Sequence, residues 1–231
     1  MMNPPRSADQ LTLKERVRLA SRKLARVTTA HTPMEFPPYP AAVAQRIERY
    51  KDDRRYVSLA LALNRIAREN IPGAFAEIGV YRGETSAFLH AQSPDRTLYL
   101  FDTFEGFPEQ DLDGRVDTRF RDTTQESVAA FLGDSTNVVF RKGYFPATAA
   151  GLEHETFAFV MLDVDIYPPA LACFEFFYPR LARGGYFFMH DYNSPESDYA
   201  IQRACAAFLK DKPELVLDLP DILGSAVFRK L

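Results

Sequence analysis

Only two cysteines occur in this chain of 231 residues, and both stand in apolar stretches, Cys173 in LACFEFF and Cys205 in RACAAF. Two separated cysteines supply neither a disulfide framework nor the paired spacing of a zinc site, so we expect both thiols to be buried and inert. The sequence also lacks an apolar run of the roughly 18–20 residues that a membrane-spanning helix needs. No transmembrane segment is therefore expected.

Positive charge is not in excess either. Lysine and arginine number 28 against 31 acidic residues, for a formal net charge of −3. This balance argues against a chain-wide nucleic-acid footprint, so no nucleic-acid partner is expected. The N-terminal residues lack the apolar core and cleavage site of a signal peptide, and the expected location is cytoplasmic. With 46% hydrophobic residues, the composition suits one packed domain.

A basic amphipathic helix is predicted over residues 13–27. Its apolar positions recur every three or four residues and share one face, whereas the other face is rich in lysine and arginine. Such a helix packs on the core, contacts a second subunit in a homo-oligomer, or lies on an anionic membrane surface. A proline-rich stretch follows and cannot continue a helix. We therefore divide the chain into residues 1–40, helix and linker, and residues 41–231, the main domain.

Short apolar runs alternate with helical segments after residue 41. Five runs read as strands: AFAEIGV, TLYLFD, NVVFRKG, FAFVMLD and GYFFMHD; helices are predicted over residues 41–70, 85–92, 123–132, 168–181 and 195–210. Strands that are apolar on both faces and separated by helices are typical of a parallel sheet covered on both sides. Two last runs, ELVLDL and SAVFRK, predict a terminal antiparallel hairpin. The fold class expected is α/β, with a doubly wound, mainly parallel, seven-stranded, Rossmann-like sheet and an N-terminal helical extension.

Acidic or glycine-containing segments follow all five of these strands. They are EIGVYRG (77–83), Asp102, Lys142-Gly143, DVD (163–165) and HDY (190–192). Ligands of open α/β sheets bind beyond the carboxyl ends of the strands. Five such ends together therefore predict one site. The charged segment after the second strand, residues 111–122, is either a lid beside that site or a solvated insertion.

The first strand end reads E-x-G-x-x-x-G and lacks the G-x-G-x-x-G fingerprint of dinucleotide-binding proteins. Gly79 and Gly83 would let a ligand approach the backbone closely. Glu77 would hold an ammonium group, and the Thr85 hydroxyl would meet a carboxylate. Asp102 is placed to bind both hydroxyls of a ribose. A ligand with an amino-acid part and a nucleoside part fits these positions, and S-adenosylmethionine is the common one.

Four segments of the sequence resemble the macrocin and mycinamicin O-methyltransferase (TylF) family. They are FDTFEGFP (101–108), KGYFPAT (142–148), LDVDIYPPAL (162–171) and YPRLARGGYFFMHDY (178–192), and the resemblance covers about residues 45–209. It implies the class I methyltransferase fold and S-adenosylmethionine as the cofactor, which makes residues 41–231 a methyltransferase domain. It also implies, for some members, methylation of antibiotic sugar hydroxyls with a divalent metal such as magnesium.

The resemblance assigns residues as well as a fold. The implied cofactor contacts are Glu77, Gly79, Tyr81, Gly83, Thr85, Asp102 and Thr103, and the strand ends add Gly143 and Asp163. Asp163 and Asp191 are the implied metal ligands, and Asp165 is the implied general base.

His190 departs from the family pattern, because the antibiotic-modifying members carry Asp-Asp-Tyr where this sequence reads His-Asp-Tyr. Magnesium prefers oxygen ligands, and imidazole suits zinc, nickel or iron better. Three roles stay open for His190: third metal ligand beside Asp163 and Asp191, catalytic base without a metal, or hydrogen-bonding residue only.

The function predicted is O-methyl transfer from S-adenosylmethionine to a hydroxyl of a small-molecule, sugar or secondary-metabolite acceptor, with or without a metal. Such transfer is an in-line displacement, so the protein mainly has to align the acceptor and remove its proton. A nicotinamide-dependent oxidoreductase is the first alternative, against which the missing dinucleotide fingerprint argues. A non-catalytic methyltransferase-like binding protein is the second, against which the carboxylates at 163, 165 and 191 argue.

Overall fold

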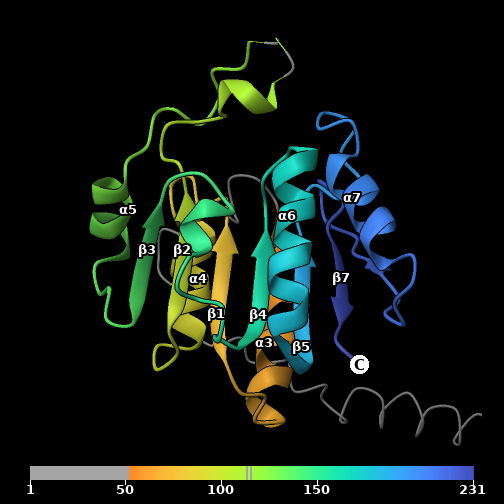
Figure 1. Ribbon diagram of the computed structural model, residues 1–231. Coiled ribbons are helices and arrows are strands. Elements are labelled where there is room, and N and C mark those ends of the chain that lie inside the picture. The colour runs from red at the N-terminus through yellow and green to blue at the C-terminus, as the bar shows by residue number, and fades with distance from the viewer. Residues whose placement is uncertain (1–51, 113, 115) are drawn as a thin grey trace, which may run out of the picture. The chain divides into compact units, whose positions relative to one another are not determined.

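The computed structural model describes residues 52–112, 114 and 116–231, and the predicted N-terminal helix and proline-rich linker lie outside this part of the chain. The described residues form three layers, a seven-stranded sheet with helices on both faces (Figure 1). None of the helices in these residues has the length and apolarity required to cross a membrane.

The sheet has the strand order β3-β2-β1-β4-β5-β7-β6. Its strands are β1 Ala74–Ile78, β2 Leu98–Asp102, β3 Val138–Lys142, β4 Phe157–Leu162, β5 Leu181–Met189, β6 Leu217–Asp218 and β7 Ala226–Arg229. The first five pair in parallel, whereas β7 is antiparallel to both β5 and β6. The predicted mainly parallel sheet with a terminal antiparallel hairpin is thus confirmed.

Two hydrophobic clusters cover the two faces of the sheet. The helices are α3 Asp53–Arg68, α4 Glu84–Gln92, α5 Gln125–Leu132, α6 Tyr167–Phe177 and α7 Ala200–Leu209. Side chains of α3, α4 and α5 belong to one cluster, and those of α6 and α7 belong to the other. From Phe159 to Leu162, successive residues of β4 alternate between them, because side chains of a strand point to opposite faces in turn. Cys173 and Cys205 are buried in the α6–α7 cluster, as predicted.

Three predicted helix boundaries are wrong. The helix expected over residues 41–70 does not run through Asp52, which is non-helical, and α3 begins at Asp53. The helix expected over residues 168–181 ends at Phe177, and Leu181 already begins β5. Pro179 lacks the N–H group that a continuing helix needs, so the chain passes through a short 3-10 turn instead. The helix expected from residue 195 begins only at Ala200, because Asp198 and Tyr199 have positive φ angles that are incompatible with a right-handed helix.

Gly79 lets the turn after β1 approach the end of β4. Its φ is +89°, and an added Cβ would lie 1.8 Å from the carbonyl oxygen of Asp163. We predict that Gly79→Ala lowers the free energy of unfolding by about 3 kcal/mol or more, because a clash with backbone adds to the strain of a positive φ. Urea denaturation measures this loss.

Gly151→Ala is the matched control. Gly151 has a similar φ of +84°, but an added Cβ would meet nothing within 4 Å. Its replacement should cost only the backbone strain, about 1–2 kcal/mol. Equal losses in the two variants would show that the close approach at Gly79 contributes nothing.

Candidate active site

A cavity of about 320 Å³ opens at the carboxyl ends of the parallel strands. It is lined by all but one of the residues that the sequence assigns to the site: Glu77, Gly79, Tyr81, Thr85, Asp102, Thr103, Gly143, Asp163, Asp165, His190 and Asp191. The exception is Gly83. An added Cβ there would lie 2.7 Å from Cγ1 of Val128, so Gly83 permits α4 to pack on α5 and does not face the cavity.

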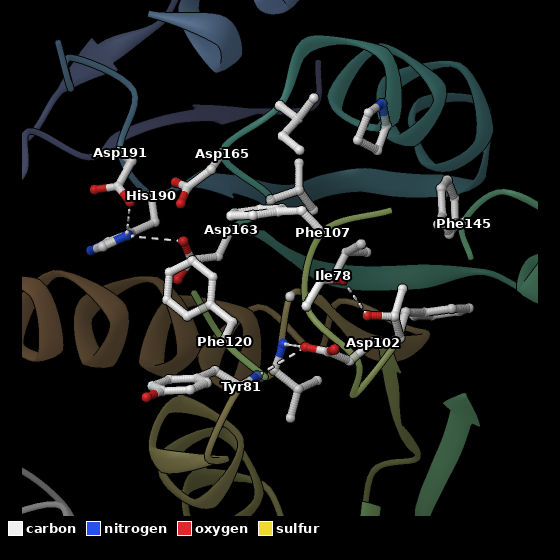
Figure 2. A pocket seen from close by; sticks show the side chains of 18 of the residues that line it. Ile78, Tyr81, Asp102, Phe107, Phe120, Phe145, Asp163, Asp165, His190 and Asp191 are labelled. Carbon is white, nitrogen blue, oxygen red and sulfur yellow. Dashed lines mark hydrogen bonds and ion pairs between the residues drawn. The ribbon is translucent and has the colours of Figure 1, made fainter. Parts of the chain in front are cut away.

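Asp102, the last residue of β2, holds the turn that follows β1. Its Oδ2 accepts hydrogen bonds from the backbone N–H groups of Val80 (2.7 Å) and Tyr81 (2.9 Å) (Figure 2). Its Oδ1 accepts one from the backbone N–H of Phe104 (2.7 Å). A carboxylate has about four acceptor positions, so a ribose hydroxyl still finds one. Thr103 is engaged locally, since its hydroxyl donates to the carbonyl oxygen of Gly106 at 2.8 Å.

Glu77 belongs to β1 and lines the cavity, with 1% of its surface exposed. Burial raises its pKa to about 8, although a hydrogen bond from the Ser86 hydroxyl and the nearby charge of Arg55 oppose this rise. A cationic ligand group beside Glu77 would favour the ionised form. Glu77 is therefore suited to bind an ammonium group, as the sequence predicts.

Arg55 is a cavity residue that the sequence analysis missed. It comes from α3, is 5% exposed, and donates from Nη2 to the Thr85 hydroxyl at 2.8 Å and to Asp163 Oδ2 at 3.3 Å. The sequence feature that could have indicated Arg55 is its spacing. Arg55 stands four residues before the fully buried Leu59 and so lies on the apolar face of the helix.

His190 stands between two carboxylates at the ends of adjacent strands. Its Nδ1 lies 3.1 Å from Asp163 Oδ1 and 3.2 Å from Asp191 Oδ2 (Figure 2). Burial and the charge of Arg55 lower the pKa of the imidazole, but the two carboxylates outweigh them and raise it to about 9. One ligand atom from each of Asp163, His190 and Asp191 lies within 4.8 Å of the others, so the three can hold a metal ion together.

Asp165 adds a third carboxylate beside Asp163 and Asp191 in the cavity lining. Burial raises its pKa to about 8, and the charges of Asp163 and Asp191 add to the rise. Its backbone has a φ of +58°, and that of Asp191 has a φ of +51°. Left-handed backbone at non-glycine residues is strained and concentrates at functional sites.

The segment after β2 covers part of the cavity. Phe107, Arg119 and Phe120 line it, and the Phe120 ring packs edge-on against Tyr81 with a centroid distance of 5.0 Å. The Arg119 guanidinium lies over the Phe107 and Phe120 rings, with Nη1 3.9 Å from Asp165 Oδ2. Of the two interpretations of residues 111–122, this arrangement favours the lid.

The family model of the macrocin O-methyltransferases (TylF) matches residues 49–230. The chain belongs to this family. Among curated proteins, it is similar to a tetracenomycin-C 4'-O-methyltransferase from Streptomyces olivaceus (27% identity over 157 residues, 60% of each chain). It is also similar to the mycinamicin III 3''-O-methyltransferase from Micromonospora griseorubida (26% identity; 64% of this chain, 66% of the other). The chain thus spans less than two thirds of the length of these relatives.

Solved structures agree with the TylF assignment at the level of the fold. The O-methyltransferase NovP superposes with a TM-score of 0.65 at 22% identity, covering 77% of this chain and 79% of that chain. The calicheamicin methyltransferase CalS11 superposes with a TM-score of 0.59 at 20% identity, covering 99% and 98%. The predicted class I methyltransferase fold is therefore confirmed.

Proposed function

We propose that this TylF-family protein transfers a methyl group from S-adenosylmethionine to a hydroxyl group of a sugar-bearing small molecule. The observation that carries the proposal is the composition of the cavity. Asp102 and Glu77 line it and suit a nucleoside and an ammonium group, and the cluster of Asp163, Asp165 and Asp191 lines the same cavity. A methyl donor and a hydroxyl acceptor can thus meet beside carboxylates.

S-adenosylmethionine supplies a methyl group that is already activated by its sulfonium. The protein then has to hold donor and acceptor in line and to take up the hydroxyl proton. Asp165 is suited to the second task, because its carboxylate is held at the cavity wall by a constrained backbone. Its raised pKa makes it a stronger base than an exposed aspartate.

The cluster of Asp163, His190 and Asp191 fits a divalent metal. Besides the convergence of the three ligand atoms, Asp191 Oδ1 is buried and has no hydrogen-bond partner among the described residues. A buried carboxylate oxygen without a donor is costly, and a cation offsets this cost. A metal there would lower the pKa of an acceptor hydroxyl, which matters because sugar hydroxyls are very weak acids. The imidazole ligand favours an ion softer than magnesium.

A saccharide acceptor is supported on two sides. The relative from Streptomyces olivaceus is named for the 4'-oxygen of a tetracenomycin that carries a rhamnosyl group. In this chain, the cavity wall after β5 carries Ser194, Glu196 and Ser197, whose polar groups suit the hydroxyls of a sugar.

Methyl transfer can be tested directly with isotope-labelled S-adenosylmethionine. The purified protein, supplemented with manganese, zinc or magnesium, is incubated with nucleotide-activated 6-deoxyhexoses and with glycosylated polyketides. We expect mass spectrometry to show one labelled methyl group on an acceptor and NMR to place it on oxygen. Label on nitrogen or carbon, or transfer only to acceptors without a sugar, would contradict the proposal.

A further inference from the structure

Arg55 is a buried cation whose hydrogen-bonding capacity is not filled. Its Nη2 donates to Thr85 and Asp163, and Nη1 lies 4.0 Å from Asp52 Oδ2. Its Nε is buried without a hydrogen-bond partner among the described residues. Burying a guanidinium is expensive and is tolerated where the group is paired and hydrogen-bonded. An unfilled donor on such a group therefore points to a ligand atom.

The charges around the cavity indicate what that ligand atom is. Eight acidic residues line it: Glu77, Glu84, Asp102, Asp111, Asp163, Asp165, Asp191 and Glu196. An anionic ligand group would be repelled everywhere except beside a cation. The other arginine in the lining, Arg119, has a side chain that is 47% exposed, and it is already paired with Asp117 at 2.8 Å. Arg55 is thus the buried guanidinium available to an anion in the part of the cavity that the structure describes.

The position of Arg55 distinguishes the two ends of a ligand. It contacts Thr85 in the first turn of α4, where backbone N–H groups also favour an anion. Glu77 is close enough for its charge to act on Arg55, whereas Asp102 binds the turn on the nucleoside side. A cation and an anion near each other, with the Thr85 hydroxyl beside the cation, are complementary to the carboxylate and ammonium of an amino acid.

We propose that Arg55 is a cofactor-specificity residue, which binds the carboxylate of the methionine part of S-adenosylmethionine together with the Thr85 hydroxyl. The inference rests on the proposed function and adds a residue that neither the motifs nor the strand ends indicate. The same guanidinium contacts Asp163, so it also fixes the orientation of that carboxylate within the acidic cluster.

The test compares two ligands that differ only in this carboxylate. S-adenosylhomocysteine and its decarboxylated analogue, 5′-S-(3-aminopropyl)-5′-thioadenosine, are titrated separately into the full chain, and calorimetry measures the affinity of each. Wild type should bind S-adenosylhomocysteine roughly 10–100-fold more tightly than the analogue, the range expected for hydrogen bonds to a charged group. In Arg55→Met this preference should vanish, with the affinity for the analogue changed by less than about threefold.

Two further variants make the result specific. Arg68→Met removes an exposed arginine from the same helix and should leave both affinities unchanged. Arg55→Lys keeps the charge but loses the planar guanidinium, so it should retain part of the preference for S-adenosylhomocysteine over the analogue. If Arg55→Met does not fold, Arg55→Lys provides the test. Equal losses for both ligands would overturn the assignment. If wild type binds neither ligand, the proposed function itself fails and the assignment with it.

Discussion

Asp165→Asn should lower kcat by roughly 10²–10⁴-fold and change the affinity for S-adenosylhomocysteine by no more than about twofold. The amide has nearly the shape of the carboxylate but cannot accept the hydroxyl proton. Asp165 lies beside Asp163 and Asp191 and away from the nucleoside end of the cavity (Figure 2), so loss of its charge should not weaken cofactor binding. Single-turnover methylation and calorimetry measure the two quantities separately.

Asp134→Asn serves as the control for the loss of a carboxylate. Asp134 is exposed in the connection between α5 and β3, where it accepts a hydrogen bond from the backbone N–H of Thr136. Its replacement should leave turnover unchanged. If Asp165→Asn instead loses turnover and cofactor affinity to the same extent, Asp165 has a structural role and another group takes the proton.

Removal of divalent metal should lower turnover by roughly 10²–10³-fold, the kinetic equivalent of several kcal/mol of charge stabilisation. Cofactor binding should survive, because Glu77 and Asp102 lie outside the cluster of Asp163, His190 and Asp191. Exhaustive chelation followed by titration with single metals measures the loss and the recovery. Turnover that is unchanged after chelation would contradict the proposed metal dependence and make His190 the favoured base.

The choice of metal can be tested at His190. His190→Asp replaces the imidazole with an oxygen ligand, so the variant should recover better with magnesium, and less well with zinc, than wild type. His154→Asp, at an exposed histidine before β4, is the control and should not shift the preference. An unchanged metal preference in His190→Asp would show that the imidazole is not a ligand.

The sheet could be predicted from the sequence because its strands have a local signature. β2 and β4 are apolar along nearly their whole length, and a polar residue at or just beyond the carboxyl end of each parallel strand marks the edge where ligands bind. Helix boundaries are weaker signals. Pro179 was counted inside a helix although it ends one, and the positive φ angles at Asp198 and Tyr199 depend on packing that a linear pattern does not contain.

The site was predictable to the extent that it consists of strand ends. Asp163, His190 and Asp191 lie together because β4 and β5 are neighbours in register. Arg55 comes from a helix instead, and its contact with Asp163 spans 108 positions of the chain, so only the tertiary fold brings the two together. Gly83 is the opposite case. The sequence pattern assigns it to ligand binding, whereas in the structure it permits α4 to pack on α5.

The central claim is that the cavity binds an adenosyl amino acid rather than a dinucleotide. It is tested most directly by calorimetric titration of the wild-type protein with S-adenosylhomocysteine and, in parallel, with NAD. We predict saturable binding of S-adenosylhomocysteine to a single site per chain, which at a hundredfold excess over Kd stabilises the fold by about 2.7 kcal/mol. NAD should produce no binding heat. Saturable binding of NAD without binding of S-adenosylhomocysteine would contradict the account.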